Sequence, residues 1–207
     1  MLTENTRRTA QHLAGELTGL QDVDWASVWA GPPQGGSAEF RAWCRRYGWE
    51  PQTVEGNLDV LTSTGGQLTL WSDGMWHPVH RLAHYVLSLR ASSPAENTEV
   101  VELCDAAWPE YLAAAENVMG PAVWSGSWEA PDFPEPPEPR FWRSRDARLR
   151  TRSPYRLAFW KPVGDPPGQA FFVLKQSVSF PTWTTDMPGS STITLNVEAP
   201  QGSRRRP

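Results

Sequence analysis

Twelve tryptophans in 207 residues constrain the fold of this chain more than any other feature of its sequence. Each indole ring hides a large apolar area. Twelve of them therefore require either a sizeable core or a large contact surface. A chain of this length can build one such core and is short for two. We therefore predict a single domain over residues 1–200, followed by a disordered basic tail over residues 201–207.

Charge and hydropathy narrow the class of protein. The net charge is −4 and the pI is near 5.6, whereas nucleic-acid binding needs a basic surface, so we expect no nucleic-acid partner. The sequence contains no run of eighteen or more apolar residues, so we predict no membrane span. The first residues lack the apolar core of a secretory signal. We therefore expect a cytoplasmic protein without a membrane partner, whose Cys44 and Cys104 are reduced thiols packed in the core.

Hydrophobic periodicity in the first half predicts two helices followed by a meander. Apolar residues recur at helical spacing over residues 3–19, and a second helix begins at Ser37 and ends at Gly48. From residue 53 the pattern becomes strand-like, with a turn over residues 64–67 and a further strand over residues 81–90. A three-stranded antiparallel meander is the simplest assembly of this segment.

The second half repeats this order with a longer helix. A broad apolar stripe runs from about Asn97 to Met119, and Pro109 inside it predicts either a kink or two helices. A short strand over residues 123–129, a proline-rich stretch and three strand candidates follow, the last over residues 155–160, 170–180 and 191–198. We predict an α+β fold with an antiparallel sheet, or two half-sheets, packed on one long kinked helix, with two N-terminal helices. Because helix and strands follow each other twice, an internal duplication is compatible with the sequence.

No catalytic, metal-binding or cofactor motif stands out. His77, His80 and His84 lie within eight residues, but His80 and His84 on one strand would be about 13 Å apart, too far to share one ion. No nucleophile elbow or phosphate loop is present, and we expect no cofactor. Acidic residues beside aromatic ones are compatible with a carbohydrate-processing site, although solvation of the proline-rich loop explains them better: Asp132, Glu135 and Glu138.

Tryptophan and arginine point instead to a contact surface, because both are frequent in binding hot spots. Arginines are concentrated in residues 140–156, where they could bind the preceding acidic stretch, an acidic partner or a phosphate backbone. The acidic net charge of the chain favours the first two. We predict a non-enzymatic, tryptophan-rich binding protein whose partner-binding residues are Trp71, Trp76, Trp124, Trp128, Phe133, Arg140, Trp142 and Arg143.

Three features carry a resemblance to known proteins: the helix end Trp43–Trp49, the segment Trp108–Met119 followed by Gly120-Pro121, and the final strands. In these the chain resembles uncharacterised α+β proteins of actinobacteria that accompany toxin or secretion loci. The resemblance implies binding of another protein, such as a toxin blocked by an immunity protein or a secreted substrate held by a chaperone. Two alternatives stay open: a small-molecule or carbohydrate hydrolase, and an accessory subunit of a larger assembly.

Overall fold

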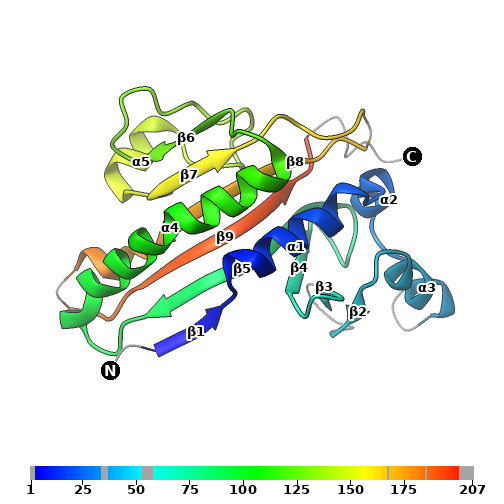
Figure 1. The fold of residues 1–207 in the computed structure, drawn as a ribbon, viewed down its shortest axis with the longest axis horizontal. Helices are drawn as coiled ribbons and strands as arrows, with labels where there is room; N and C mark the ends of the chain where they lie inside the picture. The colour runs from blue at the N-terminus through cyan, green and yellow to red at the C-terminus, as the bar shows by residue number, and fades with distance from the viewer. Residues whose placement is uncertain (1–2, 34–36, 53–57, 167, 185, 201–207) are drawn as a thin grey trace.

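The computed structural model describes residues 3–33, 37–52, 58–166, 168–184 and 186–200 (Figure 1). Its helices are α1 (Ala10–Gln21), α2 (Trp25–Ala30), α3 (Ala38–Arg46), α4 (Asn97–Met119) and α5 (Arg145–Thr151), with 3-10 turns η1 (Pro94–Glu96) and η2 (Phe180–Trp183). Its strands are β1 (Thr3–Arg7), β2 (Glu50–Pro51), β3 (Leu58–Leu61), β4 (Gln67–Ser72), β5 (Val79–Arg90), β6 (Trp124–Ser127), β7 (Arg156–Phe159), β8 (Phe171–Val178) and β9 (Ser190–Glu198). The predicted α+β class is confirmed.

All nine strands form one antiparallel sheet. Its order is β2-β3-β4-β5-β9-β8-β7-β6, and β1 pairs with the part of β5 that β4 does not reach. The long pairing of β5 with β9 joins the two meanders, so there is one sheet rather than two half-sheets. The strand order is mirrored about this pair, because α1 precedes β2 to β5 and α4 precedes β6 to β9. In each half of the chain a helix thus precedes a four-stranded meander, the order that an internal duplication would give.

One face of the sheet, called here the helical face, carries the main core. Helices α1 and α4 lie side by side across it (Figure 1), and α2 packs there through Trp25, whose ring meets Phe172 edge-on at 5.8 Å. Helix α4 continues through Pro109 without interruption, so the two-helix alternative is wrong. Burial of Trp108 and Tyr111 on either side of this proline stabilises the continuous helix.

The tryptophans are used mostly in the core. Eight are buried, namely Trp25, Trp29, Trp43, Trp49, Trp76, Trp108, Trp142 and Trp160, and the remaining four are half-buried, namely Trp71, Trp124, Trp128 and Trp183. Cys44 and Cys104 are free, buried thiols, as predicted, and burial raises the pKa of each to about 11.

The N-terminal prediction needs a correction. Residues 3–19 are not one helix, because Thr3–Arg7 forms β1 and the helix begins only at Ala10. The Thr9 side chain accepts a hydrogen bond from the His12 amide and so caps α1, which places the start of the helix after the strand. Helix α2, capped by Asp24, adds a third N-terminal helix to the two predicted. Residues 53–57 of the predicted strand, and the predicted tail over residues 201–207, lie outside the described residues.

Over the described part of the chain, no helix combines the length and the apolar character that crossing a bilayer requires. Nor do three or more His, Cys, Asp or Glu side chains gather as metal ligands within that part.

Candidate functional site

The face of the sheet opposite α1 and α4 is polar across its central strands. Residues directly opposite one another in antiparallel strands point to the same face, so the strand register places these side chains in rows. The rows on this side are Lys175–Thr194–Tyr85, Val173–Asn196–Ala83–Thr69–Asp59 and Phe171–Glu198–Arg81–Trp71.

Only one half of this second face is covered by apolar side chains. Over β7 and β8, aromatic residues from the proline-rich segment pack on the sheet in a separate small core made of Phe133, Phe141, Trp142, Leu157, Phe171 and Val173. Over β4, β5 and β9 the side chains of this face are mostly polar, and Tyr85 is exposed, whereas Thr194, Asn196 and Glu198 are buried. We call this second half the polar face, and its members are Asp59, Thr69, Trp71, Arg81, Tyr85, Thr194, Asn196 and Glu198.

Charged and aromatic side chains are held in place on the polar face. The Arg81 guanidinium lies over the Trp71 ring, 4.9 Å from its centroid. Asn196 Nδ2 donates to Glu198 Oε1 at 3.4 Å, and both side chains are buried among their neighbours. Tyr85 remains 45% exposed in the middle of this face. The arrangement offers an aromatic and cationic surface on a rigid sheet, which suits binding rather than covalent chemistry.

The predicted partner-binding residues do not form one patch. Trp71 lies on the polar face, half-buried, and the exposed Arg140 reaches Asp73 of the neighbouring β4–β5 turn at 3.8 Å. Arg143 is also exposed, close to Arg140. Trp76 is buried against Phe40, with ring centroids 5.3 Å apart, and cannot contact a partner from there.

The remaining predicted residues take part in internal contacts around the small aromatic core. Phe133 and Trp142 are buried in that core. Trp124 packs edge-on against Phe133 at 4.7 Å, and its indole N–H donates to Asp132 at 3.1 Å. Arg152 lies 5.4 Å from the Trp128 ring. These aromatic side chains therefore anchor the proline-rich segment.

The arginine-rich segment is also partly committed within the molecule. The Arg148 guanidinium stacks on Phe133 at 3.9 Å and donates to the Trp128 carbonyl. Arg156 forms a bidentate ion pair with Asp105 of α4, in which Nη2 donates to Oδ2 at 2.9 Å. Thus Arg140 and Arg156 pair with acids from other segments.

Sequence reasoning missed Arg81, Tyr85, Asn196 and Glu198. One signal could have found part of this set: polar residues at every second position of a strand that pairs on both sides, at Thr192, Thr194, Asn196 and Glu198. Their meeting with Arg81 and Tyr85 depends on the register between β5 and β9, which one sequence does not contain.

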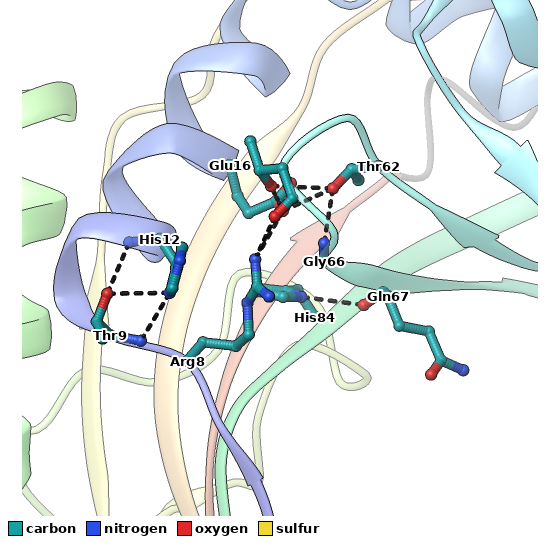
Figure 2. Close-up of polar contacts among 9 residues, drawn as sticks. Arg8, Thr9, His12, Glu16, Thr62, Gly66, Gln67 and His84 are labelled. Atoms are coloured by element: carbon teal, nitrogen blue, oxygen red, sulfur yellow. Dashed lines mark hydrogen bonds and ion pairs between the residues drawn. The ribbon is translucent and has the colours of Figure 1, made fainter.

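A second polar group lies buried on the helical face, beneath α1 (Figure 2). His84 interrupts an otherwise apolar row, Ala158–Leu174–Leu195–His84–Leu68–Val60. Its Nδ1 donates to the Gln67 carbonyl at 3.0 Å. Burial lowers the pKa of His84, and the cation of Arg8 adds to this effect, while the carboxylate of Glu16 opposes it.

Glu16 of α1 is buried and forms the other half of this group. It accepts hydrogen bonds from Thr62 at 2.7 Å and from Thr64, and Arg8 lies 3.9 Å away (Figure 2). A side chain at Gly66 would collide with its Oε1, so the turn before β4 needs glycine here. The cluster ties α1, β1 and the β3–β4 turn together.

The three histidines do not converge. His77 is exposed, His80 lies 3.4 Å from Asp73, and His84 is buried on the helical face. A cavity of about 420 Å³ adjoins His84, where β1 and β4 both end along the same edge of β5 and leave a gap. Arg8, His84 and Tyr85 line this gap, which connects the buried cluster to the polar face.

Comparison of the chain with protein-family models, with curated proteins and with solved structures found no match.

Proposed function

We propose that this chain is a non-enzymatic cytoplasmic protein that binds another protein through the polar face, in the manner of an immunity protein. The partner would be a toxin or a secreted substrate. The observation that carries the proposal is the exposed Tyr85 on the same sheet face as the Arg81–Trp71 pair. Tyrosine, tryptophan and arginine are the residue types that dominate binding hot spots.

The placement of these residues supports recognition of a folded surface. They lie on the adjacent strands β4 and β5, each of which pairs with a strand on both sides. A rigid platform loses little conformational entropy when it binds, so more of the contact energy is retained as affinity. Arg81, Arg140 and Arg143 near this face favour a partner with an acidic surface.

Site-specific photo-crosslinking in the native host tests the proposal. A photoreactive phenylalanine analogue would replace Tyr85, which is 45% exposed, or Leu103 on α4, which is 46% exposed. Equal exposure makes Leu103 a matched control on the opposite side of the sheet. We expect one dominant adduct from position 85, identified by mass spectrometry, and no such adduct from position 103. The same adducts from both positions, or none from either with the protein folded, would contradict binding through the polar face.

A growth assay tests the immunity-type role once the crosslinked partner is known. Expression of that partner alone should arrest growth, and co-expression of this chain should restore it. Trp71→Ala combined with Tyr85→Ala should abolish protection, whereas Leu103→Ala should retain it. A partner that is harmless when expressed alone would rule out the immunity role and favour a chaperone or an accessory subunit.

A further inference from the structure

A pocket at the border between the polar face and the small aromatic core gathers positive charge. Its volume is about 500 Å³. Four cationic side chains from three separate segments line it, namely Arg81 of β5, Lys175 of β8, and Arg140 and Arg143 from the segment before α5. The hydroxyls of Ser153 and Ser177 add two neutral donors to its wall.

The positive charge of this pocket is not balanced by acids that line it. No Asp or Glu is among its described lining residues, although Asp73 lies 3.8 Å from Arg140 and Glu198 is the cross-strand neighbour of Arg81. Among the residues that the structure describes, Arg81 Nε is buried without a hydrogen-bond partner. A buried cationic donor without a partner is costly, so negative charge close to the Arg81 guanidinium would be favourable.

The lowered pKa of Lys175 is a second sign of excess positive charge in this pocket. Burial lowers the pKa of its amine to about 8, and although the Glu198 carboxylate opposes this shift, the Arg81 cation adds to it. The amine thus lies where a further negative charge would favour its protonated form.

We propose that this pocket binds the phosphate group of a small anionic ligand. Guanidinium groups present paired N–H donors that match phosphate oxygens, and an ammonium group adds a point charge. Hydroxyls donate to the remaining oxygens. A single carboxylate would offset only one of the four cations, whereas a phosphate ester carries about two negative charges near neutral pH. The proposal is independent of protein binding at Tyr85.

Isothermal titration calorimetry with sodium pyrophosphate at constant ionic strength tests the site. The variants are Lys175→Met, which keeps the side-chain length, and Arg140→Ala, which alters an exposed residue and so should leave folding unchanged. Arg150→Ala is the control, because Arg150 is an exposed arginine of α5 that does not line the pocket. We expect each pocket variant to weaken pyrophosphate binding by about tenfold or more, and the control to bind like the wild type.

Three results would overturn the proposal. The first is no measurable heat from the wild type at millimolar pyrophosphate. The second is weakening of binding by Arg150→Ala as large as that by Arg140→Ala, and the third is binding of citrate as tight as that of pyrophosphate. The second result would indicate general surface attraction, and the third a carboxylate site. Crosslinking at position 85 in the Lys175→Met background keeps the two proposals separate, because Lys175 lines the pocket and is not among the predicted partner-binding residues, so loss of the phosphate site should leave that adduct in place.

Discussion

Lys175 is a residue whose environment changes its chemistry. It is one of only two lysines in the chain, and it lies in the cationic pocket, where burial lowers the pKa of its amine to about 8. A larger fraction of the amine is therefore the nucleophilic free base near pH 8 than in an ordinary lysine.

We predict that the acetylation rate of Lys175 by a limiting acylating reagent rises with pH to half its maximum near pH 8. Peptide mass spectrometry across a pH series measures this rate, with Lys161 in the same sample as the internal reference. A half-maximal rate at pH 10 or above would contradict the lowered pKa. Excess pyrophosphate should slow labelling of Lys175 but not of Lys161, if the pocket is the phosphate site.

The burial of His84 leads to a second prediction, on how the free energy of unfolding changes in acid. Burial lowers its pKa in the folded state, so below the unfolded pKa of about 6.5 the unfolded chain binds more protons than the folded one. The free energy of unfolding therefore falls as the pH drops through this range, by at most about 2 kcal/mol at pH 5.

Urea unfolding at pH 7.5 and pH 5.0 measures that loss. His84→Leu should lose less free energy of unfolding between the two pH values than the wild type does, because leucine fits the apolar row and does not titrate. Tyr85→Leu, one position along β5 and on the other face, is the control and should lose as much as the wild type. Equal losses in wild type and His84→Leu would show that other groups govern the acid sensitivity.

At the scale of elements, Asn97 joins the start of α4 to the connection between β8 and β9. Its Nδ2 donates to the carbonyls of Pro181, Thr184 and Met187, at 3.2, 3.2 and 3.0 Å, and its Oδ1 accepts from the Gly189 amide at 2.8 Å. The side chain is buried, so its removal leaves these backbone groups without their partner.

We predict that Asn97→Ala lowers the free energy of unfolding by about 3 kcal/mol. Thr98→Ala, at an exposed neighbouring position, should change it by less than about 0.5 kcal/mol. Chemical denaturation monitored by circular dichroism gives both values. A loss below about 1 kcal/mol in Asn97→Ala would mean that water replaces these contacts at little cost.

How far elements can be predicted from sequence depended on their length and their partners. Helix α4 has a long apolar stripe and strands β4, β5, β8 and β9 have strand-like apolar patterns, and all five were predicted. Helices α2 and α5 have six and seven residues, too few for a helical period to be recognised. Strand β1 was missed because its pairing with Leu87–Arg90 is distant in sequence. The polar face was missed for the same reason, since Arg81 and Glu198 meet only through strand register.

At the scale of the whole molecule, the two helix-and-meander blocks are joined on two levels. Strands β5 and β9 pair from Arg81–Glu198 to Arg90–Ser190, and α1 lies against α4 above them. One continuous core includes side chains from both blocks. We therefore predict one cooperative unfolding transition, with coincident midpoints by tryptophan fluorescence and by far-ultraviolet circular dichroism. Two separate midpoints would show that the blocks fold as independent domains.

The short strands at the two ends of this sheet affect how readily copies of the chain aggregate at high concentration. The strand β2 has two residues and includes Pro51, which has no N–H to donate, and β6 has four residues with Gly126 among them. Long, regular sheet margins act as templates on which neighbouring molecules add strands and grow into fibres. Margins this short give such growth little to extend at these two ends of the sheet.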